Sequence, residues 1–398
     1  MAHENEQASL KAPFLLLISA VAGFILANSS LSHHYAHLLN TKFQITIGLL
    51  ELINKPFLLL VNDGLMAIFF LFIGLELKRE IVVGELSNLK KAMLPIFAAI
   101  GGMLVPAIIY FSFNPSGEVS NGWGIPMATD IAFALGIVTV LSSRVPTSLK
   151  VLLAAVAIVD DLGAILVIAI LYTAKIDTNA LFLASIFFGA CIVANRMGVM
   201  KLSIYMLLGL PLWYFMLKSG VHATIAGVLL AMTIPLATKQ KKTAKLLSDI
   251  FNNQASPLDS PAVFLEKSLF KWVGYLIIPV FAFCNSGVTL ATIQFGTISL
   301  GVLFGLVLGK PLGIVGAAYL SKLFKVADLP TGVAWSQIIG IGFLAGIGFT
   351  MSLFISSLAF ETASFNNEAK FAILLASLIA GTAGAILIMR FKSTQTSS

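Results

Sequence analysis

The chain has 398 residues, of which 58% are hydrophobic and 11% are charged, and its mean hydropathy is +0.96. Soluble globular proteins carry about 25% charged residues, so this composition excludes an ordinary soluble fold. At about 20 residues per spanning helix, the apolar content is sufficient for roughly eleven or twelve crossings of a bilayer. The composition therefore predicts an all-α polytopic membrane protein.

Apolar runs bounded by charged residues predict about twelve transmembrane helices. They cover residues 12–29, 59–84, 95–113, 121–142, 150–174, 180–199, 203–218, 221–238, 271–288, 299–320, 333–358 and 368–390. Two hydrophilic stretches lie between them. Residues 30–57 are expected to form an extramembrane excursion, as an interfacial helix or a hairpin, and residues 239–270 a cytoplasmic loop.

The net charge is +7, and the isoelectric point is near 9.3. In a soluble protein, such an excess of basic residues suggests a nucleic-acid partner. In a membrane protein, basic residues instead mark the cytoplasmic side. Most of the basic residues fall on the face that holds both termini. The opposite face receives Lys42, Lys55, Lys175, Lys218 and Lys370. We therefore expect both termini to be cytoplasmic, and no nucleic-acid partner.

Four ionisable residues stand out deep inside predicted spans, far from the span ends: Asp130, Asp160, Asp161 and Lys310. Each costs about 2.5 to 3.5 kcal/mol near the bilayer centre on insertion scales, so each needs a functional or pairing explanation. The adjacent carboxylates repel each other, and successive helix positions differ by about 100°, so they face different neighbours. One interpretation is that one aspartate faces a cation cavity while the other pairs with Lys310. The alternative is a buried ion pair that only fixes helix packing.

The fourth and eleventh predicted spans contain glycine and proline where a helix should be continuous. These residues are Gly122, Gly124 and Pro126 in the fourth span and Gly340, Gly342, Gly346 and Gly348 in the eleventh. Close helix packing is one explanation. Unwound backbone at membrane depth also occurs where it is buried in protein or lines a water-filled cavity, so breaks near buried acids indicate an ion site. Asp130 would balance positive helix ends there, and Lys310 negative ones.

Several runs of the sequence resemble the NhaA family of bacterial sodium/proton antiporters. They are residues 62–70, 74–80, 128–136, 157–164, 219–224 and 309–313, which extend from the second predicted span to the eleventh. The family is itself a standard example of inverted-topology repeats with broken helices. The resemblance therefore implies one transporter domain over residues 1–398, with interrupted helices in spans four and eleven that cross at mid-membrane.

The implied activity is electrogenic, pH-regulated exchange of cytoplasmic Na⁺ or Li⁺ for external H⁺ by alternating access. By resemblance, Asp160 and Asp161 form the cation and proton site, with Asp161 the direct Na⁺ ligand. Thr129 and Asp130 lie at the helix crossing, and Lys310 pairs with Asp160. An additional proton could be carried by a second aspartate or by Lys310, and both possibilities stay open.

The family also places pH-responsive residues at the cytoplasmic mouth. They match Glu76, Arg79, Glu80 and Glu266, for which solvated helix-end charge is the alternative. Asp63 and His222 match further positions. Residues 62–64 also predict the start of a helix, and a lone histidine in an apolar span more often makes a packing hydrogen bond.

The remaining expectations concern partners and rival classes. The resemblance implies a bacterial inner-membrane protein without a cofactor that forms a homodimer, with residues 30–57 as the candidate contact. An enzyme is not expected, because the Gly-x-Gly-Asp and Tyr-Asp runs of intramembrane aspartyl proteases do not occur. A retinal protein with Lys310 as the Schiff base fits the span count poorly. A passive cation channel stays as the main rival.

Overall fold

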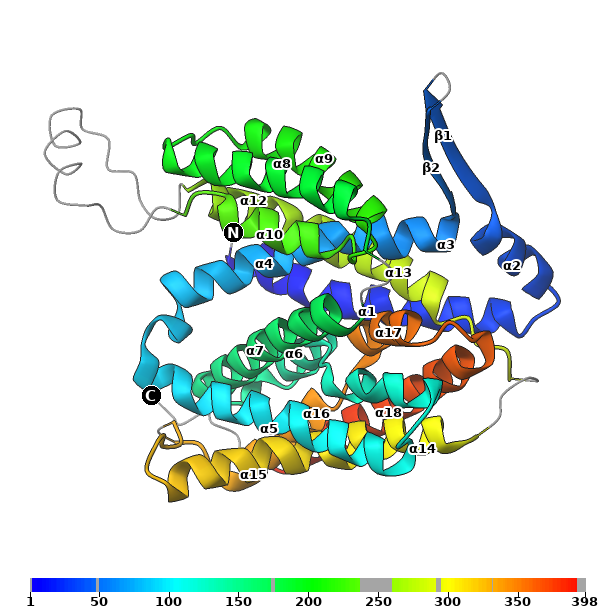
Figure 1. The fold of residues 1–398 in the computed structure, drawn as a ribbon. Helices are drawn as coiled ribbons and strands as arrows, with labels where there is room; N and C mark the ends of the chain where they lie inside the picture. Colours follow the sequence, from blue (N-terminus) through cyan, green and yellow to red (C-terminus); the bar gives the residue numbers. More distant parts are fainter. Residues whose placement is uncertain are drawn as a thin grey trace, which may run out of the picture. The chain divides into compact units, whose positions relative to one another are not determined.

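The computed structural model describes residues 2–47, 50–172, 176–236, 260–290, 295–330 and 332–391 (Figure 1). Regular structure in these ranges is helical apart from one hairpin. Among the described residues, nine helices are long and apolar enough to cross a membrane, or up to eleven spans when each of two bent helix pairs counts as one. The predicted class, an all-α polytopic membrane protein, is therefore confirmed.

The nine candidate spans follow the predicted apolar runs along the chain. They are Phe57–Val82, Leu89–Phe113, Glu118–Val140, Thr147–Leu171, Thr178–Arg196, Leu202–Ser219, Pro261–Asn285, Thr297–Leu323 and Ala363–Met389. The two bent pairs, Lys11–Ala27 with Ser32–Asn40 and Trp335–Ala345 with Phe349–Ala359, occupy the first and eleventh positions. The expected count of twelve stays a prediction.

The eighth predicted span, 221–238, contains only the nine-residue helix α10 (Ile225–Thr233) among the residues that the structure describes. Ile234 after it is extended, with ψ of 130°. The cause is Pro235, because a proline ring disfavours helical backbone at the residue before it. Hydropathy therefore overestimates the length of this helix.

The predicted cytoplasmic loop 239–270 is also corrected. Its first part, 239–259, lies outside the described residues, but its last ten residues are helical. Helix α12 (Pro261–Trp272) begins at Ser260, whose side chain accepts a hydrogen bond from the Val263 N–H at 3.4 Å. Serine at the N-cap and proline at the first helical position are both strong helix-start signals. The segment continues through η6 (Val273–Ile277) into α13 (Ile278–Asn285).

The chain divides into two compact units, which we describe separately. The first unit comprises residues 1–61, 88–168 and 278–398. Its longest helices are α1 (Ala2–Ala27), α5 (Leu89–Phe113), α7 (Thr147–Leu171), α15 (Lys310–Leu323) and α18 (Ala363–Met389). Helices α5 and α15 pack closely along glycines, since a Cβ at Gly101 would overlap the Gly313 carbonyl oxygen.

The predicted excursion, 30–57, contains both a helix and a hairpin. Helix α2 (Ser32–Asn40) follows α1 at an angle of 112°. Strands β1 (Lys42–Ile47) and β2 (Leu50–Pro56) are antiparallel, with Lys42 opposite Pro56. A short helix, α3 (Phe57–Leu60), follows β2 directly and begins the next candidate span. Both a helix and a hairpin are therefore present in this segment, while its place outside the membrane stays a prediction.

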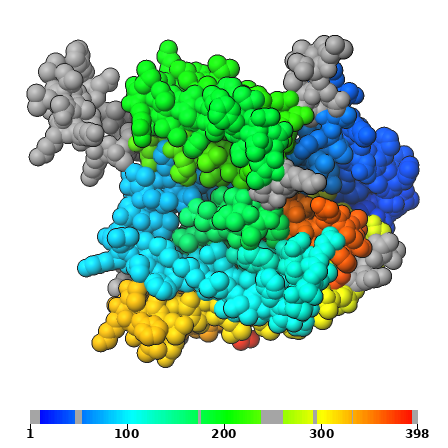
Figure 2. Space-filling view, viewed as in Figure 1, coloured from blue at the N-terminus to red at the C-terminus, as the bar shows by residue number. Residues whose placement is uncertain are grey.

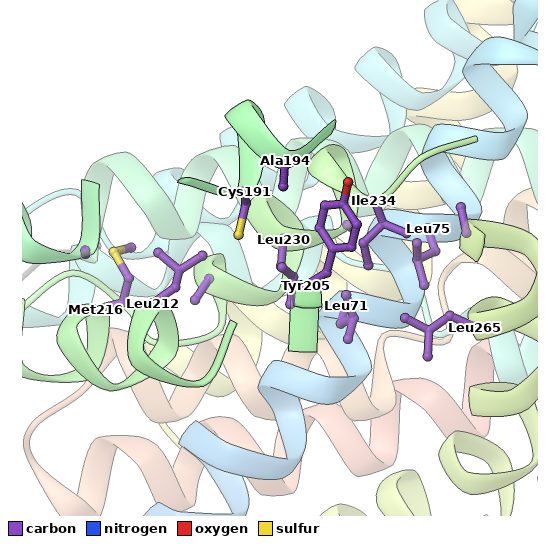
Figure 3. Close-up of a cluster of buried hydrophobic side chains, with 14 residues drawn as sticks. Leu71, Leu75, Cys191, Ala194, Tyr205, Leu212, Met216, Leu230, Ile234 and Leu265 are labelled. Carbon is purple, nitrogen blue, oxygen red and sulfur yellow. The ribbon is translucent and has the colours of Figure 1, made fainter. Parts of the chain in front are cut away.

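The second unit comprises residues 62–87 and 169–277. It contains α4 (Met66–Val82), α8 (Thr178–Arg196), α9 (Leu202–Ser219), α10 and α12. Its hydrophobic core surrounds the fully buried Tyr205 and includes Leu75, Cys191 and Leu230 (Figure 3). The Tyr205 hydroxyl donates a hydrogen bond to the Val199 carbonyl at 2.9 Å, so the one polar atom of this ring has a partner.

The packing of α5 on α15 generates a stability prediction. Gly313→Ala should lower the free energy of unfolding by about 1 to 3 kcal/mol, because the added methyl group overlaps the backbone of Gly101. Gly316→Ala on the same helix is the matched control, since a Cβ there meets nothing within 4 Å. Unfolding in detergent measures both. Equal stability of the two variants would contradict close packing at Gly313.

Candidate ion-binding site

Two breaks in helical structure meet inside the first unit. One separates the 3-10 helix η3 (Glu118–Met127) from α6 (Ile131–Val140). The other separates α16 (Trp335–Ala345) from α17 (Phe349–Ala359), which are bent by 46°. The Asp130 N–H in the first break donates to the Ile347 carbonyl in the second at 2.6 Å. Both breaks leave backbone groups at helix ends that need partners outside the helix.

Asp130 satisfies the amino-terminal ends of two helices at once. Its Oδ1 accepts the Phe133 N–H of α6 at 3.0 Å. Its Oδ2 accepts the Thr350 N–H of α17 at 3.0 Å and the Thr350 hydroxyl at 2.6 Å. A negative charge is stabilised at a helix amino terminus, and this carboxylate, which is 2% exposed, lies at two of them.

Lys310 lies at the opposite kind of helix end. Its side chain is 0% exposed, and Nζ donates to the carbonyl oxygen of Met127, the last residue of η3. Nζ also forms an ion pair with Asp160 Oδ2. The structure therefore brings together the two residues that the sequence predicted to pair, and places the ammonium group against a helix carboxyl end.

Thr129 joins this pair to the second break. Its hydroxyl oxygen lies 2.6 Å from Asp160 Oδ2 and 2.9 Å from the Ala345 carbonyl oxygen at the end of α16. A hydroxyl has one proton, so it can donate to only one of these two acceptors at a time. In the described part of the chain, Asp160 Oδ1 accepts no hydrogen bond. Asp160 Oδ1 is thus a buried carboxylate oxygen without a hydrogen-bond donor among the described residues, and such an oxygen suits a hard cation or a proton.

Asp161 follows Asp160 on α7 and is 2% exposed. As the next residue of a helix it is rotated by about 100° from Asp160. Lys310 interacts electrostatically with Asp161 as well as with its ion-pair partner Asp160. The structure thus places all five residues in the first unit: Thr129 and Asp130 lie in the first break, Asp160 and Lys310 contact residues at it, and Asp161 interacts with Lys310.

The four residues matched to a cytoplasmic mouth form a cluster in the second unit. Arg79 Nε donates to both carboxylate oxygens of Glu266, at 2.9 and 3.1 Å, and its Nη1 contacts Glu80 Oε1 at 2.6 Å. Glu76 interacts electrostatically with all three. The side chains of Glu80 and Glu266 are only 16% and 14% exposed, so freely solvated helix-end charge does not describe them.

The other two candidates make local contacts in the second unit. Asp63 belongs to the π-helical turn η1 (Val61–Leu65), and its carbonyl accepts the Trp213 indole N–H at 3.0 Å. The expectation that residues 62–64 start a helix is wrong, because helical structure already begins at Phe57. His222 Nδ1 lies 3.0 Å from the Thr224 hydroxyl, just before α10.

Sequence reasoning missed two polar contacts. Thr350 donates to Asp130 through both its backbone N–H and its hydroxyl, and the available signal was its place two residues after Gly348, the last glycine of the break. Lys78 donates to the carbonyls of Met232 at 2.7 Å and Ile234, at the carboxyl end of α10. The signal for Lys78 was a basic residue inside a predicted span, close to the charged residues Glu76, Arg79 and Glu80.

Buried carboxylates and a buried lysine at helix breaks define the class of membrane proteins that move ions through the bilayer. The family model described as Na+/H+ antiporter 1 matches residues 4–388, so the chain belongs to this family. The resemblance found in the sequence is thereby confirmed.

Individual relatives support the assignment. The chain is 45% identical over 394 residues to Na(+)/H(+) antiporter NhaA 2 of Flavobacterium johnsoniae, covering 98% of this chain and 92% of the relative. It is 48% identical over 377 residues to Na(+)/H(+) antiporter NhaA of Shewanella amazonensis, covering 93% and 92%.

The buried ion pair generates a second prediction. Lys310→Met alone should cost about 3 to 5 kcal/mol of stability, because it leaves Asp160 buried without its cation. Combining it with Asp160→Asn should recover much of this loss. Detergent-induced unfolding of the wild type, both single variants and the double variant measures the coupling. Strictly additive losses would contradict a direct interaction between these two side chains.

Proposed function

We propose that this protein exchanges cytoplasmic Na⁺ for external H⁺ across a bacterial inner membrane, with both termini cytoplasmic. The observation that carries the proposal is the buried carboxylate of Asp160, whose Oδ1 accepts no hydrogen bond from the described residues while its Oδ2 contacts Thr129 and Lys310 beside the helix breaks. Membership of the Na+/H+ antiporter 1 family supports the choice of ions. Li⁺ is a second cargo ion of the same charge and ligand preference.

Exchange follows from competition for the same oxygens. We infer that Na⁺ is held by the carboxylates of Asp160 and Asp161, with the Thr129 hydroxyl and nearby backbone carbonyls replacing water. Protonation of these carboxylates removes the charge that attracts Na⁺, so the site holds either protons or the cation. The empty, doubly anionic site is costly to move through a dry intermediate, and this suppresses leakage.

Alternating access requires that the loaded site open to either side in turn. The proposal assigns this motion to two inverted repeats that rock around two interrupted helices, which cross at mid-membrane. Moving more protons than Na⁺ per cycle makes the exchange electrogenic, and the membrane potential then contributes about 2.3 kcal/mol per net charge per 100 mV.

Regulation by pH belongs to the same proposal. Glu76, Arg79, Glu80 and Glu266 are coupled through two ion pairs and further electrostatic contacts. A change in the protonation of one glutamate therefore alters the charge interactions of its neighbours.

The proposal includes dimerisation through residues 30–57. It is supported by the hairpin that projects from the first unit (Figure 1).

The test is Na⁺-dependent proton movement in everted membrane vesicles. Asp161→Asn should abolish the Na⁺-induced collapse of an imposed pH gradient while the protein stays inserted, because the site loses an essential charge. Asp328→Asn, at an exposed acid of the first unit, is the matched control and should exchange normally. Normal exchange by Asp161→Asn would contradict the assignment. A Na⁺ current without proton movement in the wild type would show a channel instead.

A further inference from the structure

Helix α2 carries three histidines, His33, His34 and His37, that have no part in the proposed ion site. All three are exposed. In the space-filling view the dark blue surface around α2 is uncovered on the side that faces the viewer (Figure 2). Three imidazoles within five residues of one exposed helix are a concentration of metal-ligating groups.

The orientation of α2 is fixed by Tyr35, the buried residue of this helix. The Tyr35 hydroxyl donates to the Phe283 carbonyl of α13 at 2.7 Å, and the ring packs edge-on against the Phe283 ring. Gly287 leaves space for the ring, since a Cβ there would overlap it. One face of α2 is therefore docked on the first unit by an aromatic ring and a hydrogen bond.

His33 and His37 lie two residues to either side of Tyr35. Two residues correspond to about 200° around a helix, so both histidines face away from the docked side. They are also four residues apart, which places their Cβ atoms about 5 to 6 Å from each other on one side of the helix. The docking of Tyr35 thus holds two imidazoles next to each other in solvent.

The i, i+4 spacing of two histidines on a helix is the spacing with which zinc proteins share one metal between two imidazoles. The helix continues past His37 to Asn40, and the Thr41 N–H closes its end on the Leu38 carbonyl at 3.3 Å. The backbone from His33 to His37 is therefore helical throughout. His34 packs its ring edge-on against His33, with 6.1 Å between centroids.

We propose that His33 and His37 form a two-histidine site for Zn²⁺ or a similar divalent transition metal. Imidazole nitrogen suits zinc, copper and nickel, whereas Na⁺ prefers oxygen, so this site and the ion-transport site select different ions. Within the described ranges no group of three or more histidine, cysteine or acidic side chains is placed to hold a metal. Zinc here has two protein ligands and completes its tetrahedral shell with water. A bound metal clamps one turn of α2.

The experiment is a calorimetric titration of the full-length, tag-free protein in detergent with ZnCl₂. Every protein carries His3→Ala, which removes the other histidine near the amino terminus. His33→Ala and His37→Ala should each weaken Zn²⁺ binding at least roughly tenfold, because a single imidazole loses the advantage of the second one nearby. His34→Ala is the matched control and should bind Zn²⁺ as the parent does.

A site-specific readout accompanies the titration. Zn²⁺ should protect His33 and His37, but not His34, from modification by diethyl pyrocarbonate. Mass spectrometry of the proteolytic peptide that contains α2 measures the modification of each histidine. Equal Zn²⁺ affinity in all variants would overturn the proposal, as would a loss in His34→Ala equal to that in His33→Ala. Because no transport is measured, the outcome is independent of the antiport proposal.

Discussion

The contact between the two helix breaks is the constraint on which the first unit depends. Backbone groups without partners cost several kcal/mol each in a membrane, so a broken helix persists only where other groups satisfy its ends. Asp130 meets the amino-terminal ends of α6 and α17, and Lys310 meets the carboxyl end of η3. Thr129 contacts the carboxyl end of α16. Opposite charges are thus matched to opposite helix ends.

The same side chains carry the proposed exchange, which couples stability to ion binding. Asp160 Oδ2 contacts both Lys310 and Thr129, whereas Oδ1 accepts no hydrogen bond from the described residues. In the proposed exchange, Na⁺ binds at Oδ1 and competes with Lys310 for the charge of the same carboxylate. A proton on the carboxylate removes the charge that holds Lys310. In the proposed exchange, the pairing of Asp160 differs between the proton-loaded and Na⁺-loaded states, and we propose that this difference couples the site to movement of the surrounding helices.

The sequence predicts the centre of the site better than its surroundings. Asp130, Asp160, Asp161 and Lys310 are conspicuous because a charge at membrane depth is costly whatever the fold. Thr350 carries no charge, so nothing in composition separates it from other threonines of apolar helices.

The misjudged boundaries have local causes. Hydropathy counts apolar residues and takes no account of backbone conformation. It therefore did not show that Pro235 ends α10. Conversely, Glu266 and Lys267 lowered the hydropathy of residues 261–270, although Ser260 and Pro261 signal a helix start. The Arg79–Glu266 pair joins residues far apart in sequence, and only the tertiary structure brings them together.

The central claim is that Na⁺ and H⁺ compete for the same buried carboxylates. The most direct measurement is the heat of Na⁺ binding to the purified protein in two buffers of equal pH but different ionisation enthalpy. Competition predicts that Na⁺ binding releases protons, so the observed heats differ between the buffers in proportion to the protons that the buffer takes up. Equal heats in both buffers, with clear Na⁺ binding, would contradict the account.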